Sequence, residues 1–329
     1  MLSKIVVLSL LGLAVNAAET PGVIQLPGGN GPGAGKHVVL LGGDEEYRSE
    51  EALPMLAQIL SERHGFRCTV LLPVNEEGIV DPANTKSLPG SEALDSADAI
   101  VMLLRFRNWP DEDMARFEAA LKRGVPVVAL RTSTHAFNIP KDRAYHRYSF
   151  NSKEWPGGFG RRVLGETWVA HHGHHKVEGC RGIAEPGAES HPILNGVRDV
   201  FADSDVYTAN PPDDARILMR GQVTKTLDPA SPALEGKKNN PMQPVVWTRT
   251  HALEGGKPST VVCTTMGAAS DLANPGLRRL VVNAVFWAQN LPVPAEAAAD
   301  PTGVFVPTMY GFNTFKKGLR AEDFLTKAP

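Results

Sequence analysis

The chain has 329 residues, of which 42% are hydrophobic, and a formal net charge of -2 at pH 7. This length is sufficient for a large buried core, and one open α/β domain with excursions fits it better than two equal domains. The near-zero charge, without a long run of Lys or Arg, argues against nucleic acids and anionic membranes as partners.

The first 17 residues have the pattern of a secretory signal peptide. Lys4 provides the positive start, residues 5–15 are apolar, and Val15-Asn16-Ala17 forms a small-residue cleavage pattern. The apolar stretch is too short to span a bilayer. The sequence therefore predicts export, to the periplasm or the extracellular space, with no integral membrane segment after cleavage. A retained signal anchor is the alternative.

Only three cysteines are present, and this odd number gives no disulfide framework. Cys68 and Cys263 lie in apolar runs that are typical of strands. In such positions a buried thiol that packs in the core is more usual than a nucleophile or a metal ligand. We therefore expect the cysteines, Cys180 included, to be structural.

Residues 18–35 are rich in Gly and Pro, which disfavour both helix and strand, so a flexible linker is expected there. An α/β domain is predicted over residues 36–292. Its first strand is the apolar run 37–41, which Gly42-Gly43 ends, as is typical of a strand buried on both faces. Ser49 can cap the helix that follows, and Gly65 can end it.

Strands and helices alternate along the first half of this domain. Strands are expected at 66–72, 98–104 and 125–130, with a helix over 111–123. The alternation predicts an α/β fold with a doubly wound, mostly parallel sheet.

The middle of the domain, residues 138–214, has little periodicity and is expected to form long functional loops. Regular structure should return with strands at 215–219, 244–250 and 259–265 and with an amphipathic helix at 277–289. Residues 293–329 are expected to form a tail that packs on the domain through its aromatic side chains, which are Phe305, Tyr310, Phe312 and Phe315.

Polar side chains follow three of the predicted strands. They are Asp44, Glu45, Glu46, Tyr47 and Arg48 after the first, Arg105 and Arg107 after the third, and Arg131, Thr132, Ser133 and His135 after the fourth. In an open doubly wound sheet the ligand crevice lies beyond the carboxyl ends of the strands, so these sets should converge into one site. The alternative is that they are solvated loop starts, with Glu45 or Glu46 as acids preceding a helix.

Arg105 and Arg131 fit that alternative least well. Each directly follows a buried apolar run, where an unpaired charge is costly. Each therefore requires a carboxylate partner, or an anionic or carbonyl ligand that a guanidinium can bind.

Several segments together resemble the trehalose-utilisation ThuA-like proteins, whose flavodoxin-like fold is that of the class I glutamine amidotransferases. The segments are 42–48 (Gly-Gly-Asp-Glu-Glu-Tyr-Arg), 123–137 (which contains Ala-Leu-Arg-Thr-Ser-Thr-His), 191–196 (His-Pro-Ile-Leu-Asn-Gly) and 244–289. The resemblance spans about residues 36–292. It implies a role in carbohydrate metabolism, with an oxidised keto-glycoside as the expected class of substrate.

The resemblance places Arg131 at the sharp turn where an amidotransferase carries its cysteine nucleophile. ThuA-like proteins typically have a histidine there, so this chain departs from both groups, and no glutaminase activity is expected. Ser133 or Thr132 could replace the nucleophile with His135 as its base. That arrangement is disfavoured because a base normally comes from another loop.

The segment 168–176 contains four histidines. In an extended loop His172 and His174 would share a side, whereas on a helix His171, His174 and His175 would do so. Either set could bind a divalent metal such as zinc, with a third ligand from His191, Asp203, Asp205 or Glu166. The spacing matches no established zinc motif, and histidines that are solvated or stacked around a ligand are the alternative.

Trp247, Arg249 and His251 alternate with Thr248 and Thr250 along a predicted strand and could line the site with an aromatic floor and two cations. In the alternative, Trp247 belongs to the core and Arg249 pairs with a surface acid.

Two classes of function follow from these patterns. In the first, the chain is an exported hydrolase, lyase or isomerase of a sugar derivative, with Glu45, Glu46 and His135 as general acid and base candidates. Arg105 and Arg131 would then bind an oxygen on which charge develops. The other substrate-binding candidates are Asp44, Tyr47, Arg48, Arg107, Thr132, Ser133, Trp247 and Arg249. In the second, the same site is a non-catalytic sugar- or anion-binding module. The oligomeric state is open.

Overall fold

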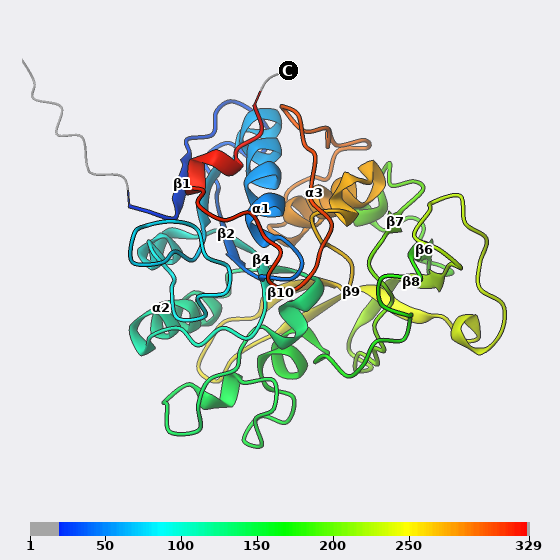
Figure 1. Cartoon of the computed structure of the whole chain (residues 1–329), viewed down its shortest axis with the longest axis horizontal. Coiled ribbons are helices and arrows are strands. Elements are labelled where there is room, and N and C mark those ends of the chain that lie inside the picture. The colour runs from blue at the N-terminus through cyan, green and yellow to red at the C-terminus, as the bar shows by residue number, and fades with distance from the viewer. Residues whose placement is uncertain (1–19, 328–329) are drawn as a thin grey trace, which may run out of the picture.

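Short apolar runs form the buried centre of the sheet in the computed structural model, which describes residues 20–327 (Figure 1). The predicted signal peptide lies outside the described residues. Five parallel strands lie side by side in the order β3 (Arg67–Leu71), β2 (His37–Gly43), β4 (Ala99–Leu104), β5 (Val127–Leu130) and β10 (Ser259–Thr264). All seven residues of β2 are buried, as expected for a strand covered on both faces.

Antiparallel strands extend the parallel centre to a sheet of ten strands within residues 20–327. They are β1 (Val23–Leu26) beside β3 and, beyond β10, β9 (Gln243–His251), β8 (Arg216–Val223), β6 (Cys180–Ala184) and β7 (Phe201–Ala202). The α/β class is thus confirmed, but the expectation of a mostly parallel sheet holds only for its centre. The wing of four strands beyond β10 is antiparallel throughout.

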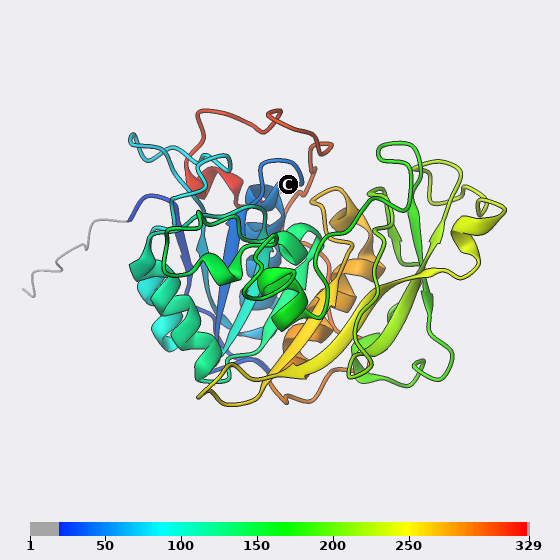
Figure 2. The same ribbon diagram turned by 90° about the horizontal axis from the view of Figure 1, so that it is seen from below.

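Three α-helices cover the two faces of the sheet within the described residues: α1 (Ser49–Gln58), α2 (Asp111–Lys122) and α3 (Pro275–Ala288) (Figure 2). Val38 and Leu40 of β2 belong to the core that contains α1 and α3. Val39 and Leu41, which point to the other face, belong to the core that contains α2. Because side chains alternate along β2, this one strand contributes residues to both cores.

Shorter helical turns connect these elements. They are η1 (Ile59–Arg63), η2 (Ser91–Ser96), η3 (Arg131–His135), η4 (His146–Tyr148), η5 (Gly160–Leu164), η6 (Pro192–Leu194), η7 (Lys237–Asn239), η8 (Asp271–Ala273) and η9 (Ala321–Phe324). Several of them interrupt the middle segment, 138–214, which also contributes β6 and β7 to the sheet. The prediction that this segment consists of loops is therefore wrong at those two strands.

The Gly- and Pro-rich segment before the domain is also more ordered than its composition indicates. Val23–Leu26 form β1, which pairs antiparallel with β3. After this strand, Gly33 N donates to His64 O over 2.8 Å. The prediction of a flexible linker over 18–35 is thus wrong for β1. In the tail, Tyr310 is buried, whereas the Phe312 side chain is exposed.

The chain runs from β2 to β3 on one side of β2 and then to β4 on its other side. Such a reversal of strand order opens a crevice at the carboxyl ends of the strands, where ligands of open α/β sheets bind. Within the described residues, no helix is long and apolar enough to cross a membrane.

Candidate functional site

The polar sets that follow β2, β4 and β5 come together at the carboxyl ends of these strands. Arg105 after β4 forms an ion pair with Glu45 after β2, and its Nε lies 3.8 Å from Glu46 Oε2. Thr132 after β5 donates its hydroxyl to Asp44 after β2. The structure thus unites the three sets that the sequence predicted to converge.

Arg131 occupies the sharp turn that follows β5. Its φ of 41° lies in the left-handed region, which is unusual for a residue with a side chain. The fully buried guanidinium donates to Asp205 Oδ1 over 2.9 Å, to Thr265 O over 2.8 Å and to Tyr47 Oη over 3.1 Å. These partners occupy both Nη atoms, so the Arg131 guanidinium holds the loops of the site together.

Asp205 is the acid around which two histidines gather. His171 Nδ1 lies 2.7 Å from Asp205 Oδ2, and His175 Nδ1 lies 3.2 Å from Asp205 Oδ1. Burial would raise the pKa of Asp205, but Arg131 and the two histidines outweigh it and hold that pKa well below its usual range. The Asp205 carboxyl group is therefore ionised.

His175 connects this group to the loop after β2. Its Nε2 lies 3.3 Å from Glu46 Oε1, on the opposite side of the ring from Asp205. Hydrogen bonds to Asp205 and Glu46 raise the pKa of His175 to about 9. His171, His175 and Asp205 each offer a ligand atom, and these atoms all lie within 4.8 Å of one another.

The histidine pair favoured for an extended loop does not form this group. His172 Nε2 lies 2.8 Å from Lys238 O, and the side chain of His174 faces solvent. The structure thus corrects the choice of His172 and His174: the histidines that meet Asp205 are His171 and His175. The segment is not a helix, and a turn begins at His174, between the two histidines that contact Asp205.

His135 lies in an aromatic wall next to the ion pairs. Its ring centroid is 5.1 Å from that of Phe106 and 5.8 Å from that of Trp168. The Arg105 guanidinium also lies over the Phe106 ring, 4.6 Å from its centroid. Burial, Arg105 and Arg131 hold the pKa of His135 well below its usual range, so the ring is neutral at physiological pH.

Most of the other substrate-binding candidates are buried supports of the loops. This group comprises Asp44, Tyr47, Arg48, Arg107, Thr132 and Ser133. Asp44 Oδ1 accepts the backbone N–H groups of Glu46 and Tyr47, and burial together with Glu45 raises the Asp44 pKa to about 6. Ser133 Oγ donates to Met102 O over 3.0 Å, which leaves it unsuited to act as a nucleophile.

Trp247 and Arg249 do not join the site. Trp247 is fully buried in the core and donates Nε1–H to Leu164 O over 2.7 Å. Arg249 pairs with Asp214 over 2.7 Å. The structure therefore shows the alternative in which Trp247 belongs to the core and Arg249 pairs with an acid.

The C-terminal tail packs over the loop after β2. Tyr310 stacks at 5.0 Å from Tyr47 and donates its hydroxyl to Asp203 O. The exposed ring of Phe312 lies 5.0 Å from the Arg105 guanidinium. The sequence indicated that the tail aromatics would pack on the domain, but it carried no signal that Phe312 would reach Arg105.

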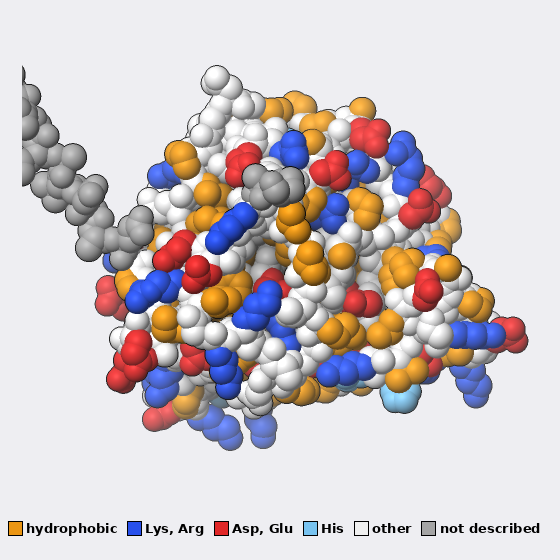
Figure 3. Space-filling model, turned by 45° about the horizontal axis from the view of Figure 1, so that its top comes forward, with side chains coloured by type: hydrophobic (Ala, Val, Ile, Leu, Met, Phe, Trp, Pro, Cys, Tyr) orange, Lys and Arg blue, Asp and Glu red, His pale blue; other side chains and the backbone are white. Residues whose placement is uncertain are grey.

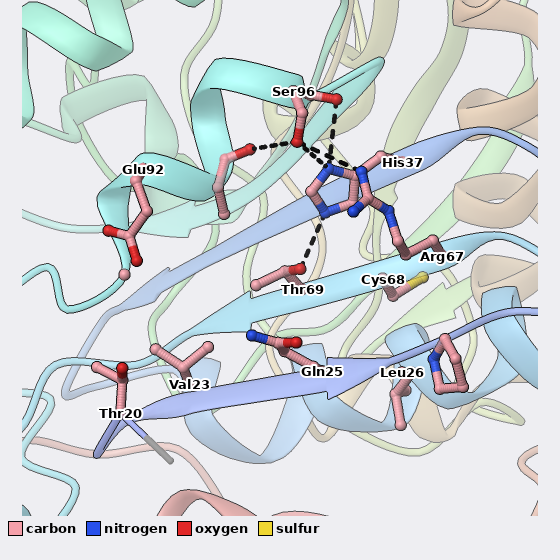
Figure 4. Close-up of a pocket in the computed structure, with 13 residues that line it drawn as sticks. Thr20, Val23, Gln25, Leu26, His37, Arg67, Cys68, Thr69, Glu92 and Ser96 are labelled. Atoms are coloured by element: carbon pink, nitrogen blue, oxygen red, sulfur yellow. Dashed lines mark hydrogen bonds between the residues drawn. The ribbon is translucent and has the colours of Figure 1, made fainter. Parts of the chain in front are cut away.

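A pocket of about 500 Å³ lies elsewhere, toward the amino ends of β2 and β3 (Figure 4). Its central polar group, His37, lies 2.9 Å from Thr69 Oγ1 and 3.0 Å from Ser96 Oγ. Burial and the neighbouring Arg67 lower the pKa of His37. These polar groups satisfy one another, so the pocket offers weaker evidence for chemistry than the strand ends do.

One face of the molecule carries side chains of both charge signs (Figure 3). On the face shown in Figure 3, acidic and basic side chains are interspersed among apolar and uncharged ones. This distribution agrees with the near-zero net charge and suits a small polar ligand better than a polyanion.

Comparison with solved structures finds two proteins described as ThuA-like. One, from Parabacteroides merdae ATCC 43184, has 15% identity and a TM-score of 0.45, and the match covers 89% of this chain and 99% of that one. The other, from Bacteroides uniformis ATCC 8492, has 14% identity and a TM-score of 0.47, with 80% and 94% covered. A comparison with curated proteins gives no match.

The family model for ThuA, described as trehalose utilisation, matches residues 38–288. This range contains the parallel centre of the sheet, the three polar loops and the histidine segment. It also agrees with the extent of the resemblance seen in the sequence. The chain therefore belongs to the ThuA family.

Proposed function

We propose that this protein is an exported enzyme that acts on a sugar derivative, with a keto-glycoside as the class of substrate. The observation that carries the proposal is the meeting of Glu46, Arg105 and the neutral His135 at the carboxyl ends of three adjacent parallel strands. Membership of the family named for trehalose utilisation supports a carbohydrate substrate.

These groups suit proton abstraction next to a ketone. Either a carboxylate or a neutral imidazole can accept a proton from carbon, and Glu46 and His135 provide one of each. Arg105 can stabilise the enolate oxygen that forms, because its side chain is partly open to solvent. Loss of the glycosidic oxygen, with a proton from the acid partner, would complete an elimination.

Aromatic side chains near these groups support a sugar as the ligand. Phe106 and Trp168 flank His135, and both are partly exposed. An aromatic face can pack against the C–H groups of a sugar ring while polar groups bind its hydroxyls.

The test is an NMR time course of the purified chain in D₂O with trehalose and other disaccharides, each beside its keto derivative. We expect only the keto derivatives to react: the signal of the hydrogen next to the ketone should disappear, by exchange with deuterium in the substrate or by elimination of the glycosidic oxygen. Glu46→Gln should slow turnover by about 10²–10⁴-fold, the usual contribution of a general acid or base. Arg105→Gln should slow it by about 10²–10³-fold, as is usual when a donor to a developing oxyanion is lost. Glu112→Gln, on the exposed side of α2, is the matched control.

A second outcome would identify the alternative function. The acids and Arg105 already pair with one another, as they would in a rigid binding site. Saturable binding of a sugar with no turnover and no deuterium exchange would establish a binding module and remove the catalytic assignments.

A further inference from the structure

His171, His175 and Asp205 are held in place by contacts that are independent of any ligand. His171 pairs with Tyr207 in an isolated antiparallel bridge, and the amides of His172 and Gly173 both donate to Val206 O. The histidine segment is therefore fastened to the segment that carries Asp205. The three side chains are brought together by the backbone rather than by chance contact on the surface.

The two imidazole rings present the same atom to the acid. In both His171 and His175 it is Nδ1 that faces Asp205, at 2.7 Å and 3.2 Å. Ligand atoms about 2.0–2.2 Å from a tetrahedral ion lie roughly 3.3 Å apart. The distance from His175 Nδ1 to Asp205 Oδ1 already fits this geometry. The distance from His171 Nδ1 to Asp205 Oδ2 would have to increase by about 0.6 Å, which the exposed His171 side chain allows.

Glu46 and Arg131 supply the outer contacts that metal sites usually have. Glu46 Oε1 lies 3.3 Å from His175 Nε2 and holds a proton on that nitrogen, so the Nδ1 lone pair becomes available when a metal ion displaces the Nδ1 proton that faces Asp205. This is the carboxylate–histidine–metal arrangement that fixes the tautomer of a ligand. Arg131 also donates to Asp205 Oδ1, the oxygen that faces His175, and so fixes the carboxylate.

The group is also open on one side. The side chains of His171 and His175 are 38% and 25% exposed, whereas Asp205 is fully buried. Three protein ligands with an accessible side are typical of metal sites that keep a coordination position for water or substrate. Two imidazoles and one carboxylate suit first-row transition metals better than Mg²⁺ or Ca²⁺.

We propose that His171, His175 and Asp205 bind one divalent transition-metal ion, such as Zn²⁺, at the carboxyl ends of the strands. Glu46 is then a positioning residue for His175 and not a ligand. The site goes beyond the proposed function, because it does not depend on which sugar, if any, is turned over.

The test measures metal binding in the absence of substrate. The full chain, free of any affinity tag, is stripped with a chelator and then titrated with Zn²⁺ by calorimetry and with Co²⁺ by visible absorption. We expect one ion per chain. His171→Ala should weaken binding at least about 100-fold, and Glu46→Gln should weaken it about 10–100-fold, as usual for an outer contact.

His174→Ala is the matched control, because it removes a solvent-facing histidine from the same segment. It should bind the ion as tightly as the unmodified chain does. Circular dichroism checks that each variant is folded. Because the His171 side chain is exposed, its replacement should have little effect on folding. Absence of saturable binding to the unmodified chain, or equal affinity of His171→Ala and His174→Ala, would overturn the proposal.

These outcomes are separable from those of the turnover assay. If the metal binds but keto-glycosides are not converted, the enzyme proposal fails and the site stands. If turnover occurs and is unchanged by stripping, while no ion binds, the metal proposal fails and the acid–base proposal stands.

Discussion

Arg131 Nη2 lies 2.9 Å from Asp205 Oδ1, and both side chains are completely buried. The guanidinium also lies 3.7 Å from the ring centroid of Tyr207 and 4.7 Å from that of Tyr47. This pair connects the turn after β5 to the segment whose acid meets His171 and His175. The sharp turn after β5 thus carries a structural ion pair.

We expect Arg131→Ala to destabilise the protein by about 3–5 kcal/mol, because it leaves the Asp205 charge buried without its partner. Urea denaturation followed by fluorescence measures this free energy of unfolding. The control is Arg116→Ala, which removes an ion pair between two partly exposed side chains, Arg116 and Asp95. Such a pair contributes about 0–1 kcal/mol. Equal losses in the two variants would contradict the structural role of Arg131.

Trp168→Ala should raise KM about 10-fold with little change in kcat, if the ring packs against the sugar in both the bound and the transition state. Steady-state kinetics on the keto derivative measure both constants. Trp155→Ala is the matched control, since Trp155 is also partly exposed but its ring packs at a tilt against Tyr148, 4.9 Å between the centroids. A loss confined to kcat would assign Trp168 to orientation of the reacting groups instead.

The convergence of the loops after β2, β4 and β5 could be predicted from the sequence. Continuous apolar runs identify strands buried on both faces, and such strands are parallel with their carboxyl ends at one edge. The charged residues that directly follow these runs, Arg105 and Arg131, must then meet acids. Their partners proved to be Glu45, Glu46 and Asp205.

The roles within the site depended on contacts that the local pattern does not specify. Arg131 and Arg105 look alike in sequence, yet only Arg131 of the two is completely buried by its partners, which include Asp205 and Thr265. The choice among the histidines failed for the same reason, because a bridge to Tyr207 sets the direction of His171. The spacing of His171 and His175 by four residues was the one available signal.

Arg48 should hold the tail against the loop after β2. Its guanidinium donates to Glu46 O over 3.0 Å and to two tail carbonyls, Gly311 O over 3.0 Å and Met309 O over 3.1 Å. We expect Arg48→Ala to speed amide hydrogen exchange in residues 308–314 at least about 10-fold, because charged hydrogen bonds contribute roughly 1.5–3 kcal/mol each. Mass spectrometry of peptic fragments locates the change.

The control for this experiment is Arg63→Ala. Arg63 also donates to tail carbonyls, at Asp300 and Pro301, but it does so at the exposed surface and upstream of Arg48's contacts. Its removal should leave exchange in 308–314 unchanged. Faster exchange of that segment in both variants would mean that the tail loosens as a unit and that Arg48 has no special part in anchoring it.

Glu50, in the first turn of α1, should make the protein less stable as the pH rises. Its side chain is fully buried, neither carboxyl oxygen has a hydrogen-bond partner within residues 20–327, and burial raises its pKa from 4.5 to about 8. Between these two values the folded chain holds a proton that the unfolded chain has lost. The free energy of unfolding must therefore fall as the pH rises from about 4.5 to about 8.

Glu50→Gln removes this titration and should raise the thermal midpoint at pH 8, with little effect at pH 5, because an amide resembles the protonated acid. Scanning calorimetry at both pH values measures the difference, which should reach a few kcal/mol in the free energy of unfolding. Glu112→Gln, whose side chain is 82% exposed, should show no such pH-dependent gain. The contrary result is a difference in the free energy of unfolding between Glu50→Gln and the unmodified chain that is the same at pH 5 and at pH 8. It would show that Glu50 is not protonated in the folded state.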